Sequence, residues 1–445
     1  MPSRKTKAAA WQAVVDYRVL SSLTPHLNNP KLHTELQLRA LGRSMVAHGF
    51  VSPILIDAGG IIIAGHARFE AAKLIGIEKV PTIKLEHLTP AQQRAYRIAD
   101  NRLAEVGASW SIEKLNIEVA SILEIDGEYD LSLTGFDPRD LELALDVAEV
   151  EKTTPDPDVP AVEANSVSQP GDLWQIGDHI LLCGTALEQA SYSALLKNER
   201  ADMMFSDPPF NVPINGHVSG KGRAKHREFL EASGEMTSSE FQQFLSVFLM
   251  QAGRASKPGS LHYVCMDWRH IGALLSAGSV AFDELKNLCV WAKSNAGMGS
   301  LYRSQHELVA VFKKGGAAHI NNVELGKNGR NRTNVWAYAG MNSFSSERNE
   351  TLALHPTCKP LALVRDAILD ASRRDDIILD PFGGSGTTLL AADACRRRAR
   401  LIELDPLYCD VIVRRAEKTL GLEATLAKTS QTFSCVASGR AVANV

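Results

Sequence analysis

The sequence predicts an α/β protein with a cofactor-binding sheet in its C-terminal part and a smaller α+β domain before it. The sheet is indicated by a glycine-rich turn at residues 380–388, which joins the apolar run 376–379 to a helix beginning near Leu389. A second apolar run, 401–404, ends in acidic residues about 20 positions after the turn, as in nucleotide-type cofactor sites. The smaller domain is indicated by short strands and helices that alternate between residues 11 and 122.

The smaller domain is expected to contain four short strands. They are predicted at 14–19, 53–57, 61–64 and 79–83, and Ala58-Gly59-Gly60 joins the middle two as a hairpin. Helices are expected from Glu35 and after Gly65. Arg68 lies in the first turn of the second helix, where exposed N–H groups and a cation can bind phosphate; the alternative is that Gly65 makes only a tight turn.

A polar stretch separates this domain from the next. One more amphipathic helix is predicted before it, with Asp137 as the N-cap. Residues 149–170 carry four prolines and several acids, and they have too little apolar surface to repay the entropy of ordering. We therefore predict domains at 1–148 and 171–445, joined by a linker at 149–170.

The C-terminal domain is expected to begin with a hairpin at 174–185, which leaves Thr185 near the cofactor. The apolar run 201–205 has no helical spacing and is predicted to be a buried strand. A helix is expected at 239–250, followed by strands at 261–266, 288–292 and 306–314.

The turn Ser206-Asp207-Pro208-Pro209-Phe210 ends the buried strand. Consecutive prolines fix φ and remove two N–H donors, so the turn is stiff and its carbonyl groups remain acceptors. The Asp207 carboxylate and the Pro208 carbonyl, with the Phe210 ring beside them, suit a planar substrate that bears an NH2 group. The alternative is a strand end followed by a proline-rich turn with no function.

The glycine-rich turn points to a cofactor rather than to a nucleotide triphosphate. Its glycines let the backbone approach a ligand closely, and Glu403 can accept hydrogen bonds from ribose hydroxyl groups. The turn lacks the spacing of a dinucleotide fingerprint, and no Gly-Lys-Ser/Thr phosphate loop follows it.

Four motifs in this order resemble an amino-group DNA methyltransferase of the β class. They are Asp-Pro-Pro-Phe at 207–210, His-Pro-Thr-Cys-Lys-Pro at 355–360, the turn at 380–388, and Ile-Glu-Leu-Asp-Pro at 402–406. The resemblance covers residues 171–422. It implies a circularly rearranged, Rossmann-like fold that binds S-adenosylmethionine. The cofactor-binding residues it implies are Thr185, Asp207, His355, Thr357, Lys359, Asp380, Phe382, Gly383, Gly384, Ser385, Gly386, Thr387, Glu403 and Asp405.

The resemblance implies methyl transfer to the exocyclic amine of a base flipped out of duplex DNA, with residues 207–210 as the catalytic turn. Aspartate at the first position of the motif is more typical of adenine N6, whereas cytosine N4 stays open. Cytosine C5 is disfavoured, because no cysteine here follows a proline. Two other classes stay open: a DNA-binding partition protein without turnover, and an enzyme acting on an RNA or protein amine.

Two basic stretches are candidates for DNA contacts. The loop after Phe210 is expected to track phosphates, although such a run can be only a solvated loop. The interval 315–350 is rich in Asn, Gly and Arg, which suit contacts with base edges, and holds target recognition in the resembling family. The candidates are Lys221, Arg223, Lys225, Arg227, Lys327, Arg330 and Arg332.

The first domain resembles the ParB/sulfiredoxin-like fold. Residues 29–33, 65–68 and 100–103 lie where that family carries its motifs, but His66-Ala67 replaces the usual charged pair and Asp100 replaces a glutamate. The resemblance implies that CTP or another nucleotide binds with magnesium. The residues implied are Gly65, His66, Arg68, Asp100, Asn101 and Arg102. A docking or DNA-clamping domain without a nucleotide site is the alternative.

Composition describes an ordinary globular protein. Of 445 residues, 45% are apolar and 22% charged, and the net charge is −3, so DNA contacts must come from local patches. Seven scattered cysteines without CxxC pairs favour a reducing cytoplasm and give no metal site. No apolar run of 18 residues occurs. Double-stranded DNA is the expected partner, no membrane is expected, and a homodimer stays open.

Overall fold

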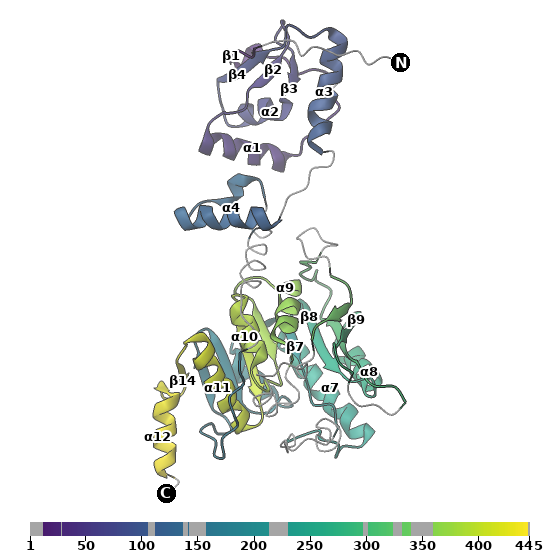
Figure 1. Ribbon diagram of the computed structural model, residues 1–445, viewed down its shortest axis with the longest axis vertical. Coiled ribbons are helices and arrows are strands. Elements are labelled where there is room, and N and C mark those ends of the chain that lie inside the picture. Colours follow the sequence, from purple (N-terminus) through teal and green to yellow (C-terminus); the bar gives the residue numbers. More distant parts are fainter. Residues whose placement is uncertain are drawn as a thin grey trace. The chain divides into compact units, whose positions relative to one another are not determined.

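The computed structural model describes most of the chain as two compact units, Met1–Leu145 and Asp146–Val445 (Figure 1). The described residues are 12–27, 29–105, 112–136, 141, 157–212, 230–296, 301–323, 332–339 and 359–443. Within these ranges no helix has both the length and the apolar character needed to cross a bilayer. Each unit is described by itself.

The first unit contains a four-stranded sheet in the order β1-β4-β2-β3. The strands are β1 Val15–Val19, β2 Ile54–Ile56, β3 Ile62–Ala64 and β4 Lys79–Lys84. The predicted β2–β3 hairpin is confirmed as an antiparallel pair, while β2 and β4 run parallel. Alternating apolar residues explain the core, in which Ile54, Ile56 and Ile62 are fully buried against Phe69 and Val80.

Helices pack around this small sheet. They are η1 Leu20–Ser22, α1 Glu35–His48, α2 His66–Leu74, α3 Pro90–Glu105, α4 Ile112–Ile125 and η2 Leu131–Thr134. Thr34 caps α1 by accepting a hydrogen bond from the Gln37 N–H at 3.2 Å. Gly65 begins α2 with φ +99°, a conformation that favours glycine. The helix predicted after Asp137 lies outside the described residues, apart from Leu141, which packs with Val119 of α4.

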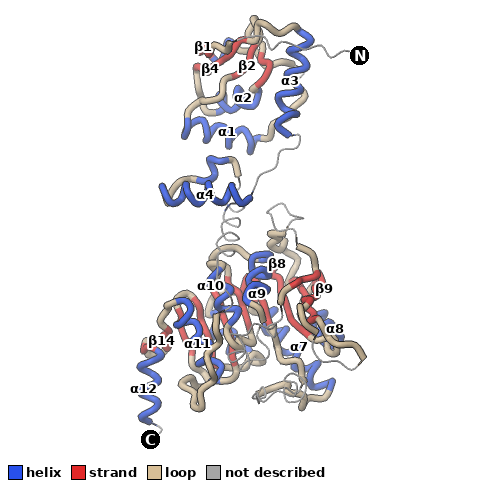
Figure 2. The backbone as a smooth tube through the Cα atoms, in the orientation of Figure 1, coloured by secondary structure: helices blue, strands red, loops and turns tan. Residues whose placement is uncertain are grey.

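The second unit contains an eleven-stranded sheet among its described residues, in the order β11-β9-β10-β8-β7-β12-β13-β6-β5-β14-β15. Strands are drawn in red in Figure 2. The strands are β5 Leu173–Ile176, β6 His179–Cys183, β7 Ala201–Ser206, β8 Ser256–Met266, β9 Glu284–Ala292, β10 His306–Lys313, β11 Val335–Ala337, β12 Ile377–Asp380, β13 Arg398–Glu403, β14 Ala424–Leu426 and β15 Gln431–Thr432. The predicted strands are therefore confirmed, whereas β11, β14 and β15 were not predicted.

The centre of this sheet is parallel. β8, β7, β12, β13 and β6 are neighbours with the same direction, so their carboxyl ends lie at one edge. Chain order reverses between β7 and β12, and ligands of open α/β sheets bind at such a switch point. The predicted Rossmann-like, circularly rearranged sheet is confirmed.

Helices cover both faces of the sheet (Figure 1). On one face α6 Gln189–Leu196, α7 Ser238–Arg254 and α8 Ile271–Ala281 share a core with Met204, Leu379 and Ile402. On the other face lie α9 Leu361–Ala371, α10 Thr387–Ala394 and α11 Pro406–Leu420. A last helix, α12 Phe433–Ala443, packs at the β14–β15 end.

Part of the predicted linker is docked rather than free. The carboxylate of Asp410 on α11 accepts hydrogen bonds from the N–H groups of Val167 at 2.6 Å and Ser168 at 2.8 Å. Glu163 pairs with Arg414 at 2.9 Å. These contacts satisfy backbone N–H groups of a polar segment. Residues 157–170 are therefore docked on the second unit. Residues 149–156 lie outside the described part of the chain.

Candidate active site

The carboxyl edge of the parallel strands brings the motifs of the sequence together. Asp207 follows β7, the glycine-rich turn follows β12, Glu403 ends β13, and Thr185 follows β6. β7 and β12 pair through Met203–Ile378 and Met204–Leu379, so the catalytic turn and the cofactor turn are neighbours across one strand pair. The structure therefore unites two motifs that lie far apart in the chain.

Asp207 is held by a buried lysine. The Lys359 ammonium lies 2.5 Å from Asp207 Oδ2, and the lysine side chain is 7% exposed. Asp207 Oδ1 is buried and has no hydrogen-bond partner among the described residues. A buried acceptor without a partner is costly unless a ligand supplies a donor. One oxygen of the carboxylate is thus occupied, and the other is available.

Lys359 also contacts a second carboxylate. Its Nζ lies 3.1 Å from Glu307 Oε2, while Glu307 Oε1 lies 2.5 Å from Lys293 Nζ. Two carboxylates and two ammonium groups therefore form a charge-balanced cluster. Glu307 and Lys293 belong to no motif of the sequence, although a charged residue at the end of an apolar strand is a signal that could have singled out both.

Charge within this cluster opposes the effect of burial. Burial raises the pKa of Asp207 above its usual value and Glu307 adds to the rise, whereas Lys359 lowers it. Burial alone would lower the pKa of Lys359, but Asp207 and Glu307 raise it overall. Burial would also raise the pKa of Glu307, yet Lys359 and Lys293 bring it below the ordinary value. The ammonium of Lys359 thus favours the ionised form of both carboxylates.

The rest of the catalytic turn forms one wall of the site. Pro208 is buried, and Phe210 is half-buried with its ring centroid 5.5 Å from Lys359 Nζ. Asn211, which sequence reasoning did not single out, has φ +54° and holds the turn. Its Oδ1 accepts from the N–H groups of Gly234 and Met236, and its Nδ2 donates to the Met236 carbonyl at 2.8 Å. These bonds fix the direction of Phe210.

The glycine-rich turn is open at Gly384, whereas Gly383, Ser385 and Gly386 are buried. Gly384 has φ +52° and Gly386 has φ +83°, both in the left-handed region. A Cβ on Gly386 would lie 3.1 Å from Ile412, whereas a Cβ on Gly384 would meet only a carbonyl oxygen at 3.9 Å. Gly384 thus faces open space. Arg415 supports the turn from α11 by donating to the Ser385 carbonyl at 3.0 Å.

Glu403 lies beside Gly384. Its Oε2 accepts from the Gly384 N–H at 2.7 Å and its Oε1 accepts from the Asp405 N–H at 2.9 Å. Burial raises the pKa of Glu403 to about 7. An open glycine turn with an adjacent carboxylate is the donor and acceptor set that an adenosyl cofactor requires, so these residues fit S-adenosylmethionine.

Other predicted cofactor residues contribute to the frame of this turn. Asp380 accepts from the Phe382 N–H at 3.1 Å and from Thr388 Oγ1 at 2.6 Å, and burial raises its pKa to about 8. The Phe382 ring packs edge-on against Phe248, with centroids 5.0 Å apart. Thr185 Oγ1 accepts from the Leu187 N–H. Thr387 begins α10, and Asp405 caps α11.

Lys359 contacts Asp207, so its predicted contact with the methionine portion of the cofactor stays a prediction. Arg332 forms ion pairs with Asp366 at 2.7 Å and Asp370 at 2.9 Å, and a DNA contact would compete with them. The remaining candidates lie outside the described residues: Lys221, Arg223, Lys225, Arg227, Lys327, Arg330, His355 and Thr357.

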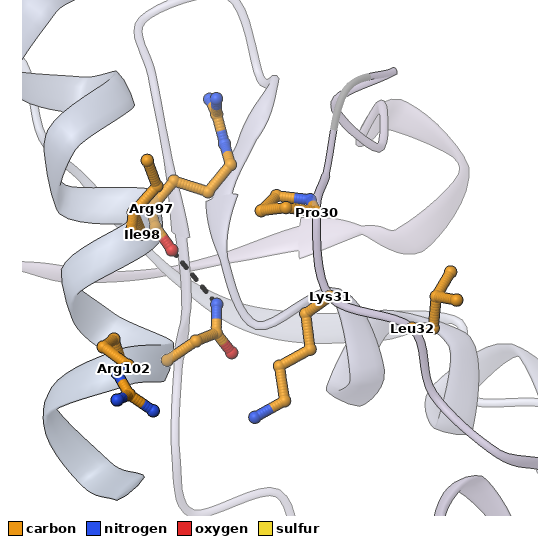
Figure 3. A pocket seen from close by; sticks show the side chains of 7 residues that line it. Pro30, Lys31, Leu32, Arg97, Ile98 and Arg102 are labelled. Atoms are coloured by element: carbon orange, nitrogen blue, oxygen red, sulfur yellow. Dashed lines mark hydrogen bonds between the residues drawn. The ribbon is translucent and has the colours of Figure 1, made fainter. Parts of the chain in front are cut away.

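The first unit has a separate cationic pocket (Figure 3). It has a volume of about 440 Å³ and lies between the 29–33 loop and α3. Asn101 Nδ2 donates to the Arg97 carbonyl one turn earlier on α3, at 3.0 Å. The residues that line it are Pro30, Lys31, Leu32, Arg97, Ile98, Asn101 and Arg102. Two of the predicted nucleotide-binding residues, Asn101 and Arg102, therefore line the same pocket as the cationic side chains of Lys31 and Arg97.

The other predicted nucleotide residues lie near α2 or on the surface of α3. His66 Nε2 accepts from the His26 N–H at 3.2 Å, and burial, with Arg97, lowers the pKa of His66 to about 4. Arg68 is half-buried, and burial lowers its pKa. Asp100 is exposed. A neutral His66 therefore contributes to the fold of the 26–33 loop.

Cofactor affinity is expected to depend on pH through Glu403. Protonation below its pKa of about 7 removes a lone pair and the charge that would accept ribose hydroxyl groups. The dissociation constant for S-adenosylmethionine should therefore rise as the pH falls from 8 to 6, measured by calorimetry. In Glu403→Gln residue 403 does not titrate, so the affinity should change less over this range than in the wild type. Equal pH dependence in both proteins would contradict the assignment.

The open glycine turn and Glu403 lie beside the acceptor turn of Asp207, at the switch point of a parallel sheet. This arrangement defines a Rossmann-like methyltransferase. Residues 201–414 match the family model described as DNA methylase, and residues 113–170 match the one described as ParB-methyltransferase HTH domain. The chain therefore carries a part that matches an amino-group DNA methylase and, before it, a part that matches a ParB-methyltransferase HTH domain. The resemblance predicted from the motifs is confirmed.

Individual relatives match the methyltransferase part. M.HpaI of Haemophilus parainfluenzae, a type II methyltransferase, is 23% identical over 254 residues, which are 54% of this chain and 74% of that protein. The type II methyltransferase M2.DpnII of Streptococcus pneumoniae is 25% identical over 230 residues, 50% of this chain and 84% of that protein. The crystal structure of the M1.HpyAVI–SAM complex covers 53% of this chain and 97% of its own, at 20% identity and a TM-score of 0.40.

Proposed function

We propose that this protein methylates the exocyclic N6 amine of adenine in double-stranded DNA. The observation that carries the proposal is the state of Asp207: Lys359 occupies Oδ2, and the buried Oδ1 has no partner among the described residues. An amine that donates a hydrogen to Oδ1 would satisfy this orphan acceptor. We expect the enzyme to act in the cytoplasm.

The residues of the chain act by orienting the amine. The lone pair of an exocyclic amine is delocalised into the ring, so the nitrogen is a poor nucleophile. Asp207 Oδ1 and the Pro208 carbonyl can accept hydrogen bonds from the two N–H groups of the amine. These bonds favour a pyramidal nitrogen, whose lone pair then points at the methyl group. S-adenosylmethionine supplies that methyl group on a sulfonium. Phe210 offers a face for the flipped base to stack on.

The assignment to adenine depends on the aspartate at the first position of the motif. Cytosine N4 presents the same NH2 chemistry, so the acceptor geometry supports either base. The test is nucleoside analysis of DNA incubated with the protein and S-adenosylmethionine labelled on the methyl group. Label in N6-methyladenine is expected, label in N4-methylcytosine would overturn the choice of base, and no label in any DNA would overturn the proposal.

A second function is proposed for the pocket of the first unit. Lys31, Arg97 and Arg102 bring three cations to one 440 Å³ hollow, which supports the binding of a nucleotide triphosphate such as CTP with magnesium. The alternative, a DNA-clamping domain, would use the same cations without selecting a nucleotide.

Loss of one of these cations should weaken nucleotide binding. Lys31→Gln is expected to lower affinity for magnesium–CTP by about tenfold, because one charge-assisted contact to phosphate is lost. Calorimetry on the full chain measures this, and Lys73→Gln, an exposed lysine on α2, is the control. Equal affinity in both variants, or no binding by the wild type, would contradict a nucleotide site.

A further inference from the structure

We propose that Glu307 is a positioning residue for methyl transfer, which keeps the Lys359 ammonium on one oxygen of Asp207 and so leaves the other oxygen for the amine. The inference depends on amino-group transfer and not on which base is methylated. Glu307 lies outside every motif that pointed to the reaction.

The position of Glu307 is fixed by the sheet. It lies near the start of β10, opposite Trp291 of β9, and β10 also pairs with β8. Its carboxylate is 16% exposed and uses both oxygens on lysines, at 2.5 Å for Lys293 and 3.1 Å for Lys359. β10 has a paired strand on each side, and Lys293 forms an ion pair with the Glu307 carboxylate. The carboxylate therefore stays in place when a ligand moves, and it serves as a fixed anchor.

The Lys359 ammonium needs a fixed carboxylate beside it, because the flexible lysine side chain does not by itself determine where the ammonium points. The side chain has four rotatable bonds and ends in three donors that can be directed freely. Without an opposing carboxylate, the ammonium could bridge both oxygens of Asp207 and block the amine. Glu307 Oε2, at 3.1 Å from Nζ, offers the ammonium a second carboxylate, which competes with Oδ1 of Asp207 for its donors. The Phe210 and Trp291 rings, at 5.5 and 5.9 Å from Nζ, complete the enclosure.

Among the residues that the structure describes, five titratable groups interact with Asp207 from the surrounding elements. They are Lys359 before α9, Glu307 on β10, Lys293 after β9, Cys265 on β8 and Asp380 at the end of β12. Glu307 raises the pKa of Asp207, whereas Lys359 and Lys293 lower it. Removing Glu307 and removing Lys293 should therefore move the titration of Asp207 in opposite directions.

The test compares Glu307→Gln with Lys293→Gln by steady-state methylation of DNA as a function of pH. Glu307→Gln should lower kcat by at least about tenfold with a smaller change in KM for DNA, because a misplacement of order 1 Å can cost about a hundredfold. The acid limb of kcat/KM should move to lower pH in Glu307→Gln, since a negative neighbour is lost. It should move to higher pH in Lys293→Gln, since a cation is lost.

Glu284→Gln is the matched control, because Glu284 pairs with Lys286 at 2.9 Å on the same strand pair but at the exposed end. An unchanged kcat in Glu307→Gln would overturn the proposal. A loss of kcat with a fixed acid limb and a lower melting temperature would assign Glu307 a purely structural role, which also overturns it. Wild-type label in N4-methylcytosine would change the base and leave this inference intact.

Discussion

Asp207→Ala is expected to lower the rate of methyl transfer by about 10²- to 10³-fold while S-adenosylmethionine still binds. The substitution removes the charged acceptor that orients the amine, and loss of one preorganised polar contact to a reacting group typically costs this much. Single-turnover transfer of a labelled methyl group measures the chemical step, and calorimetry measures cofactor binding. Because the acceptor contacts the base and not the ribose, the two readouts should separate.

The controls for this variant address folding. Asp207→Ala leaves the Lys359 ammonium buried with only Glu307 to balance it, which destabilises the site. The double variant Asp207→Ala with Lys359→Met removes both charges and should regain melting temperature without regaining activity. Asp178→Ala, an exposed aspartate in the turn between β5 and β6, should behave as wild type. Wild-type rates in Asp207→Ala would refute the role of this carboxylate.

Glu403→Ala should weaken S-adenosylmethionine binding by about 100-fold. Glu403 fixes Gly384 and Asp405 through their N–H groups, at 2.7 and 2.9 Å, and is the acceptor available for ribose. Charge-assisted hydrogen bonds contribute about 1.5–3 kcal/mol each, so the loss of one or two accounts for this factor. Calorimetry at pH 8, where Glu403 is ionised, is the measurement.

Methyl transfer at saturating cofactor separates binding from chemistry in this variant. Glu403 lies with the cofactor turn rather than with Asp207, so kcat should fall much less than affinity. Glu284→Ala, at an exposed ion pair, is the control and should bind normally. Unchanged affinity in Glu403→Ala would contradict the placement of ribose beside β13.

The fold could be predicted from the sequence because three of the four motifs, those at 207–210, 380–388 and 402–406, lie where a strand ends. The apolar runs before Asp207, Asp380 and Glu403 are short, lack helical spacing and are followed by proline within a few residues, which indicates buried strands. The motif order implied the circularly rearranged fold, and the strand order of the structure places the switch point between β7 and β12. The short strands β11, β14 and β15 carried too few residues for a periodicity to be read.

The candidate site could be predicted only in part, because side-chain pairing across the sheet leaves no local signal. Lys359 and Asp207 are 152 residues apart in the chain, and nothing in either neighbourhood indicates that they touch. Arg332 was expected to face DNA because arginine suits base edges, but its guanidinium pairs with Asp366 and Asp370. The composition of residues 149–170 predicts a linker. The contact of its second part with Asp410 leaves no local signal, because Asp410 lies about 240 residues later.

The pairing of β7 with β12 has a consequence for biosynthesis. The Ile377 N–H, just at the start of β12, donates to Asp202 on β7 across 175 residues of sequence. A ribosome adds about 5–20 residues per second, and domains fold as their chain emerges. The acceptor turn therefore leaves the ribosome many seconds before the strands that hold the methyl donor. A partly made chain cannot modify DNA, and activity begins only once β13 and α11 have been added.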